Sequence, residues 1–180
     1  MRAVLTLALM FAAIGGIGCG NDDAEVAEGP IEALETNVVA FGGVEYRVIL
    51  FRQMNPRNPP DKAVYDGPLP ADQGLYAAFV VACNASDGEQ IPTKRIHLED
   101  AFGEIFRPIE LEEDNPFAYR PRPLEPGECL PDEGSAADRT FSAAVVVFRV
   151  PFEDIRERPM ILALDATDAD VPGARVELDL

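Results

Sequence analysis

The sequence predicts an all-β protein in which two antiparallel sheets pack face to face as a sandwich. Three observations favour this fold class: short apolar stretches separated by turns, 16 Pro and 14 Gly in 180 residues, and the lack of a long amphipathic helical pattern. Proline and glycine interrupt regular structure, and short strands at close spacing are typical of sandwiches and barrels. The length allows one such domain after removal of a leader.

Eight stretches of the chain have the composition of strands. The first two form a predicted hairpin around Gly42 and Gly43, because a two-residue turn of this kind needs positive φ. The segments 75–84 and 141–150 are apolar on both faces, which is typical of central strands. Two long loops, 55–73 and 111–138, each carry five prolines. The predicted strands are residues 38–41, 44–52, 75–84, 95–99, 105–110, 141–150, 160–165 and 175–180.

The first 18 residues have the features of a secretory signal peptide. Arg2 supplies the positive charge, and residues 3–18 are an uncharged stretch of 16 residues. A membrane-spanning helix needs roughly 20 apolar residues, so we interpret the stretch as a removable leader. We therefore expect the domain that follows to lie outside the cytoplasm.

The end of this leader resembles a bacterial lipoprotein signal, in which a cysteine follows the cleavage point and receives diacylglycerol. Cys19 has that position, directly after Gly18. The resemblance implies lipid attachment at Cys19 and an anchor in the cell membrane or the outer membrane, whereas ordinary cleavage after Gly18 is the alternative. Residues 19–36 are acidic and lack a sustained apolar period, so we expect a flexible tether there and the domain in residues 37–180.

The chain is strongly acidic, with 32 Asp and Glu against 15 Lys and Arg and a formal net charge of −17. Removal of the leader takes away Arg2 and makes the mature chain one unit more negative. Such a surface repels phosphate backbones, so nucleic acid is excluded as a partner. The apolar fraction of 47% is too high for a disordered chain.

Four motifs occur in an order that resembles a known family. A strand ends at Asn84, a Leu-x-Asp-x-x-Gly hairpin begins at Leu98, a Pro-Gly turn follows at 126–127, and a later strand ends at Pro151. This order resembles the immunoglobulin-like β-sandwich domain of bacterial lipoproteins and secreted antigens, related to the immunoprotective extracellular antigen type. The resemblance covers residues 38–180 and implies an immunoglobulin-like antiparallel sandwich of seven to eight strands. It implies the fold and an address in the envelope but little about function, because no enzymatic activity is agreed for the family.

The chain has three cysteines. With Cys19 assigned to the lipid, Cys83 and Cys129 are left to pair, and disulfides persist in exported domains. In the resembled sandwich, the strand that contains Cys83 and the strand that follows Cys129 are antiparallel neighbours, so the resemblance implies a Cys83–Cys129 disulfide. In the alternative, Cys83 is a small buried side chain and Cys129 is a free loop thiol.

The sequence contains no arrangement of residues typical of an enzyme. His97 is the single histidine, no nucleophile elbow occurs, and zinc sites need several His or Cys ligands. We therefore expect no catalytic activity, no metal site and no cofactor, and a strand position for His97. Two acidic loops, 110–114 and 165–170, leave calcium binding open, although neither has the twelve-residue ligand pattern. Asn84 begins an Asn-Ala-Ser glycosylation triplet, but we expect it to be a turn residue at the end of its strand.

Aromatic and basic side chains gather in one loop of this acidic chain. Phe117, Tyr119, Arg120 and Arg122 lie in the second Pro-rich loop. Exposed Tyr and Arg often anchor interfaces, so this loop is a candidate interaction site; a rigid loop that covers a sheet edge is the alternative. We predict a binding module of unknown ligand that contacts an envelope protein or an extracellular molecule. A structural or assembly accessory of the envelope is the first alternative, and a hydrolase is a distant one.

Overall fold

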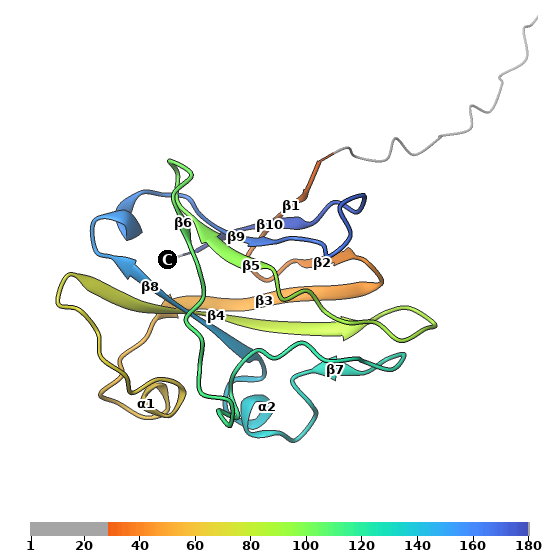
Figure 1. Ribbon diagram of the computed structural model, residues 1–180, viewed down its shortest axis with the longest axis horizontal. Coiled ribbons are helices and arrows are strands. Elements are labelled where there is room, and N and C mark those ends of the chain that lie inside the picture. Colours follow the sequence, from red (N-terminus) through yellow and green to blue (C-terminus); the bar gives the residue numbers. More distant parts are fainter. Residues whose placement is uncertain (1–28, 180) are drawn as a thin grey trace, which may run out of the picture.

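A computed structural model describes residues 29–179 as two stacked β-sheets (Figure 1). Sheet I contains, in spatial order, β1 (Ile31–Leu34), β10 (Ala174–Leu178), β9 (Met160–Leu164), β5 (Ile96–Glu99) and β6 (Ile105–Phe106). Sheet II contains β2 (Val38–Phe41), β3 (Val44–Gln53) and β4 (Gln73–Asn84), and both β7 (Cys129–Leu130) and β8 (Ala144–Pro151) pair with the other edge of β4. The predicted all-β sandwich is confirmed.

Alternating side chains of the two sheets form the core between them. In β10, Val176 and Leu178 are buried at 1% and 5% exposure, whereas Arg175 and Glu177 point to the other face of the sheet. Phe148 of β8, which is fully buried, lies in the same core. The predicted wet face of the last strand is therefore confirmed for the residues that the structure describes.

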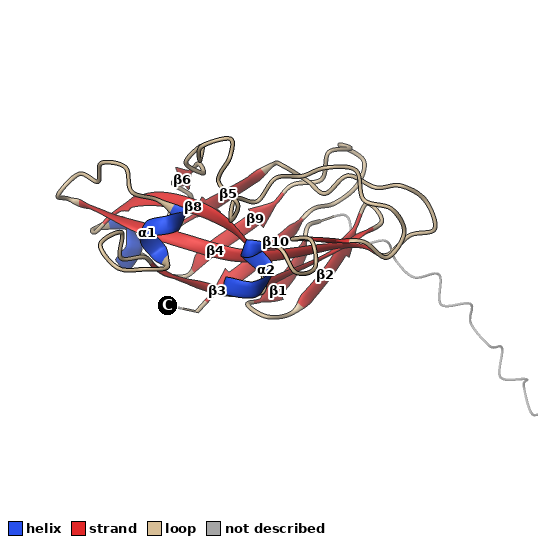
Figure 2. Ribbon diagram, turned by 90° about the horizontal axis from the view of Figure 1, so that it is seen from below, coloured by secondary structure: helices blue, strands red, loops and turns tan. Residues whose placement is uncertain are grey.

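A second apolar cluster covers the other face of sheet II. Leu75, Phe79 and Val145 belong to it, and they pack against α1 (Asp61–Val64), α2 (Ala136–Phe141) and the two Pro-rich loops. The helices lie below sheet II in Figure 1 and in front of its strands in Figure 2. The predicted central strands β4 and β8 are thus covered on both faces. A short 3-10 helix, η1 (Asp154–Arg156), follows β8.

The hairpin between β2 and β3 has the predicted glycine turn. Gly42 and Gly43 have φ of 57° and 75°, the left-handed region in which glycine is favoured. A Cβ on Gly43 would also lie 2.9 Å from the side-chain amide of Gln90. The turn therefore requires glycine at the second position for its conformation and for the close approach of the 85–92 loop.

The N-terminal boundary of the domain differs from the prediction. Residues 31–34, assigned to the tether from the acidic composition of residues 19–36, form β1 and run parallel to β10, with Ile31 opposite Ala174. Ile31 and Ala33 pack against the core while Glu32 points away. An alternation this short is hidden in an acidic segment. The pairing of β1 with β10 is parallel, whereas the other strand pairs of the described residues are antiparallel. With β1 and β7, which were not predicted, the sandwich has ten strands within residues 29–179, more than the seven to eight predicted.

Two predicted strands end earlier or begin later than expected. The predicted strand 105–110 is a strand only at Ile105–Phe106, because Pro108 has no N–H to continue the ladder with β5. The start of the predicted strand 141–150 is the last turn of α2. Ser135 caps that helix by accepting from Asp138 N–H, and Ser142 ends it in the left-handed conformation.

Cys83 and Cys129 form the disulfide that the resemblance implied. They are register partners in β4 and β7, with their Cα atoms 4.0 Å apart. Beside them Asn84, 2% exposed, donates through its amide to Gly88 O (2.7 Å) and Leu124 O (2.8 Å). This amide holds two loops together, which confirms the turn assignment and leaves the glycosylation triplet without an accessible acceptor.

Candidate functional site

After β6 the chain leaves sheet I and crosses the open side of the sandwich to sheet II (Figure 1). This crossover segment, residues 107–121, contacts the free edge of β8 at two places. Ile109 N–H donates to Val147 O (2.7 Å), and further along Tyr119 N–H donates to Val145 O (3.0 Å). Between these contacts the segment runs over the outer face of sheet II, where Leu111 packs in the second apolar cluster.

A cleft of about 160 Å³ lies where the crossover segment passes between the edges of β5 and β8. We call it the crossover cleft. Most of its lining is apolar and comes from Ile96 of β5, Val146 of β8, and Ile109, Leu111 and Tyr119 of the crossover segment. Apolar walls with a few polar groups are typical of ligand sites in proteins.

Two backbone N–H groups at the strand edges face this cleft. Asp165, which follows β9, donates its N–H to Arg95 O. The backbone groups of successive residues in a strand point to opposite edges. The N–H and C=O of Ile96, the next residue, therefore point away from β9. In β8, the N–H and C=O of Val145 both pair with the crossover segment. Val147 lies two residues further along the same strand, so its N–H also points away from β4. Among residues 29–179, no protein group accepts a hydrogen bond from the N–H of Ile96 or Val147.

Charged side chains line the same cleft. Lys94 precedes β5, Arg120 follows Tyr119, and Glu110 lies on the crossover segment. The guanidinium of Arg120 donates to Leu111 O (3.3 Å) and to the backbone oxygen of Glu112, which fixes its position. Two cations and one carboxylate give this cleft a positive local balance in a chain whose net charge is −17.

The backbone of the loop before β5 is held by two tyrosines. Tyr46 Oη accepts from Thr93 N–H (2.7 Å), and Tyr119 Oη donates to Thr93 O (2.9 Å). Burial raises the pKa of Tyr46 to about 12 and raises the pKa of Tyr119 well above its usual value, so both phenols stay protonated. These contacts fix the wall of the crossover cleft formed by Lys94 and Ile96.

The predicted interaction loop is divided by the structure. Phe117 and Tyr119 are half-buried: Phe117 packs edge-on against Phe141 at 5.5 Å between ring centres, and Tyr119 packs against the core. The expectation that these aromatic side chains are exposed is wrong, because Phe117 covers the outer apolar face of sheet II and Tyr119 packs against the core between the sheets. Arg120 lines the crossover cleft, whereas Arg122 lies apart and pairs with Glu128 (3.2 Å) and Asp132.

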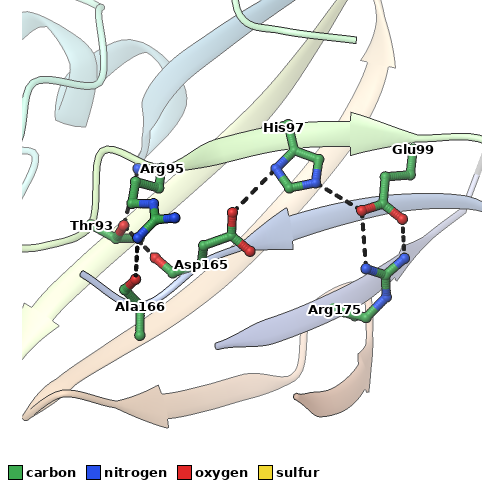
Figure 3. Close-up of polar contacts among 7 residues, drawn as sticks. All are labelled: Thr93, Arg95, His97, Glu99, Asp165, Ala166 and Arg175. Atoms are coloured by element: carbon green, nitrogen blue, oxygen red, sulfur yellow. Dashed lines mark hydrogen bonds and ion pairs between the residues drawn. The ribbon is translucent and has the colours of Figure 1, made fainter. Parts of the chain in front are cut away.

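A second polar cluster lies on the outer face of sheet I (Figure 3). His97 contacts Glu99 through Nε2 (2.7 Å) and Asp165 through Nδ1 (3.5 Å), and Arg175 donates to both oxygens of Glu99. His97 and Arg175 are both register partners of Ala163, and both reach the carboxylate of Glu99. His97 has the predicted strand position, and its neighbours form a cross-strand ion network.

We expect Glu99→Gln to lower the free energy of unfolding by about 1 kcal/mol at pH 7. Hydrogen bonds from Arg175, and then from His97, hold the pKa of Glu99 below its usual value. A carboxyl with a lowered folded-state pKa adds stability above its unfolded pKa, and that stability is lost as the pH falls through the folded pKa. The difference between wild type and variant should therefore shrink below about pH 4.

Urea unfolding at pH 7, 5 and 3.5 measures this difference. Glu104→Gln, on the exposed turn of the same hairpin, is the matched control and should change stability by less than about 0.5 kcal/mol. A wild-type–variant difference that stays constant or grows as the pH falls would contradict the prediction.

The acidic loops and the predicted leader add no site to the part of the chain that the structure describes. Within residues 29–179 there is no group of three or more His, Cys, Asp or Glu side chains arranged to hold a metal ion. Cys19 and the predicted leader lie outside the described residues. In the part of the chain that is described, none of the helices has the length and apolar character needed to cross a membrane.

Most of the residues that line the crossover cleft could not be predicted from the sequence. Lys94, Ile109 and Leu111 come from segments that were predicted to be a loop, a strand and the start of another loop. One local signal was available: Pro108 interrupts a strand-like stretch, which indicates that the chain leaves its sheet there. The contact of Ile109 with Val147, 38 residues further on, has no signal in a single sequence.

No protein-family model and no curated protein matches the sequence. Among solved structures, the yjhA protein of Bacillus subtilis is similar over 82% of this chain and 99% of its own, with a TM-score of 0.56 and 13% identity. An uncharacterized β-sandwich protein of Clostridium difficile is similar over 84% and 96% of the two chains, with a TM-score of 0.50 and 12% identity. The ycdA protein of B. subtilis, proposed to be a lipoprotein, has a TM-score of 0.48 and 10% identity over 79% of this chain and 38% of its own. At these identities the likeness shows the fold alone: a β-sandwich shared with proteins of uncharacterised function.

Proposed function

We propose that this chain is a cell-envelope lipoprotein whose sandwich is an extracytoplasmic binding module, of the immunoprotective extracellular antigen type, and that the crossover cleft binds its partner. The observation that carries the proposal is the composition of the cleft: apolar walls, two backbone N–H groups without a protein partner in residues 29–179, and two cations in an acidic chain. Buried polar groups are usually paired, so unpaired donors at a strand edge favour a binding role.

The size of the cleft supports a protein or peptide partner. Sites for drug-sized molecules usually enclose about 300–1,000 Å³, and the crossover cleft encloses about 160 Å³. A space of this size suits one side chain of a larger partner. Protein interfaces commonly concentrate their binding energy on such an inserted anchor.

The contacts of His97 support the proposal that the domain is not an enzyme. Nucleophilic catalysis needs a nucleophile hydrogen-bonded to the base. Both ring nitrogens of His97 contact carboxylates, Glu99 through Nε2 and Asp165 through Nδ1. Among residues 29–179, no Ser, Thr or Cys side chain is hydrogen-bonded to either nitrogen. We therefore assign His97 to the ion network of sheet I.

The binding role is tested by filling the cleft. Ala118 lines it, so Ala118→Leu should displace an anchor side chain of the partner. The matched control is Ala63→Leu, an exposed position on α1. We expect chemical crosslinking on native membranes to trap a partner with wild type and with Ala63→Leu, and to lose it with Ala118→Leu. Equal crosslinking by a folded Ala118→Leu protein would remove the cleft as the binding site.

We expect Cys19→Ala to release the protein from membranes into the soluble fraction. Each acyl CH₂ buried in a bilayer contributes about 0.8 kcal/mol, and stable anchoring needs more than one chain. Removal of the lipid should therefore abolish partition into the membrane pellet. Fractionation followed by immunoblotting measures this, with Gly20→Ala as a control that keeps the cysteine. Identical partition of Cys19→Ala and wild type would contradict the lipid anchor.

A further inference from the structure

The crossover cleft is closed to a continuous strand along β8. The crossover segment pairs with β8 at Ile109–Val147 on one side of the cleft and at Tyr119–Val145 on the other. Between these two contacts, the N–H of Val147 is the one backbone group on this edge of β8 that has no hydrogen-bond partner in residues 29–179. A partner chain running through in an extended conformation would have to break one of these contacts, so the geometry suits a chain end that enters from the side.

The edge of sheet I leads to the same conclusion. β6 pairs with β5 as far as Leu98, opposite Phe106. The next outward-facing residue of β5 is Ile96, and the corresponding place in the partner strand is occupied by Pro108, which pairs with Phe148 of sheet II instead. A peptide that pairs with Ile96 cannot continue along the edge of β5, because β6 already pairs with the next part of that edge. Such a peptide could therefore pair with β5 through its last residue alone.

The polar groups of the cleft match a carboxylate. Ile96 and Val147 offer N–H donors, and Lys94 and Arg120 add two positive charges. The C=O of Ile96 is an acceptor on the same strand edge, and these donors and cations outnumber it. Charge-assisted hydrogen bonds to a carboxylate are stronger than neutral ones, and backbone N–H groups are a recurring means of capturing a terminal carboxylate. Glu110 is the single acidic side chain of the lining, so the local balance remains positive.

We propose that the crossover cleft binds the carboxyl-terminal residue of a partner protein, which has an apolar side chain. The side chain packs against Ile109 and Leu111, and the terminal carboxylate accepts hydrogen bonds from the cleft N–H groups beside Lys94 and Arg120. This inference rests on the proposed function, because it names the class of partner that the same cleft takes.

The test uses fluorescent pentapeptide pools with Leu, Val or Phe at the last position and the full-length protein in detergent. One pool has free carboxyl ends, a second is amidated, and a third is amidated with Asp or Glu before the apolar residue. Fluorescence anisotropy gives the Kd of each pool. We expect the free-carboxyl pool to bind at least tenfold more tightly than the other two, and the Kd to rise with salt.

Protein variants locate the site. Ala118→Leu should abolish binding of the free-carboxyl pool, and Lys94→Gln should weaken it about five- to tenfold. Lys62→Gln, an exposed lysine on α1 that lines a different hollow, should leave the Kd unchanged. Circular dichroism and melting temperature verify that each variant is folded.

Each other result overturns the inference. No binding, equal binding of the amidated pool, or equal binding of the pool with internal acidic residues rules out recognition of a chain end. Binding that persists in folded Ala118→Leu places it elsewhere on the protein. If crosslinking on membranes depends on Ala118 while the peptides fail, the binding module stands and the carboxyl-terminal assignment is wrong. If the peptides bind as expected but crosslinking does not depend on the cleft, the proposed function fails instead.

Discussion

Removal of the Cys83–Cys129 disulfide is expected to lower the free energy of unfolding by about 4 kcal/mol. The two cysteines are 46 positions apart in the sequence, and a crosslink that closes a loop of this length removes many conformations from the unfolded chain. The native contacts around the bridge should persist without it. Asn84 N–H donates to Glu128 O (2.9 Å) and Gly127 N–H donates to Asn84 O (3.0 Å) beside the bond.

The double variant Cys83→Ala/Cys129→Ala and the reduced wild type should lose the same amount of stability in urea unfolding. If the two losses of unfolding free energy agree, the loss is due to the missing crosslink, because the reduced wild type keeps the sulfur atoms and the double variant does not. Thiol counting on the denatured, unreduced protein is the control: free thiols at Cys83 and Cys129 would contradict the bridge. A loss of less than about 1 kcal/mol would show that the unfolded chain gains little freedom.

The disulfide also concerns the binding site. It ties β7 to the end of β4, and the chain between Pro121 and Cys129 leads directly out of the crossover segment. Reduction should therefore raise the hydrogen-exchange rates of residues 122–130 more than those of β9, which is held by pairs on both sides. Pro121 lines the cleft and directly precedes these residues, so we expect reduction also to weaken partner binding.

The strands that were predicted well have a complete local pattern. β3 alternates buried and exposed positions from Val44 to Val48, and β10 does so at Ala174–Leu178. Period-2 alternation is a local consequence of strand geometry, so one sequence suffices to detect it. The apolar segments of β4 and β8 are equally easy to predict, because a strand that is buried on both faces has no polar residue in its middle.

The features that were missed depend on contacts between distant segments. β1 has four residues and lies in an acidic segment, and its order comes from pairing with β10 at the opposite end of the chain. The burial of Phe117 and Tyr119 has no local signal, because Phe117 packs on the outer face of sheet II and Tyr119 packs against the core between the sheets. The crossover cleft arises from the path of the chain between sheets, for which Pro108 was the single local indication.

Asn84→Asp is expected to lower the free energy of unfolding by about 4 kcal/mol at pH 7. The side chain of Asn84 is 2% exposed, and its NH₂ group donates to Gly88 O and Leu124 O. Aspartate has the same shape, so no cavity forms. It replaces both donors with an oxygen that faces two carbonyl oxygens, and each buried hydrogen bond lost in this way costs about 1–3 kcal/mol. The other oxygen still accepts from Ser86 N–H (2.9 Å) and Ser86 Oγ (2.8 Å), as in the wild type.

The pH dependence identifies the cause of this loss. Burial and the two carbonyl oxygens should raise the pKa of the introduced carboxyl in the folded state, because both disfavour its charged form. The two Ser86 donors act in the opposite direction on the other oxygen, and we expect the raising effects to dominate at a buried site. A carboxyl with a raised folded-state pKa destabilises the protein most above that pKa, and the penalty declines as the pH falls toward the unfolded value of about 3.9. The difference between wild type and Asn84→Asp should therefore be largest at pH 7 and smaller at pH 4.

Asn55→Asp is the matched control for this measurement. Asn55 is exposed, and its side chain accepts from Arg57 N–H (3.1 Å) through an oxygen that aspartate retains. The control should change the unfolding free energy by less than about 0.5 kcal/mol at either pH. A loss below about 1 kcal/mol for Asn84→Asp would mean that the loops at residues 85–92 and 122–128 do not depend on the amide, and that the asparagine which ends β4 is replaceable.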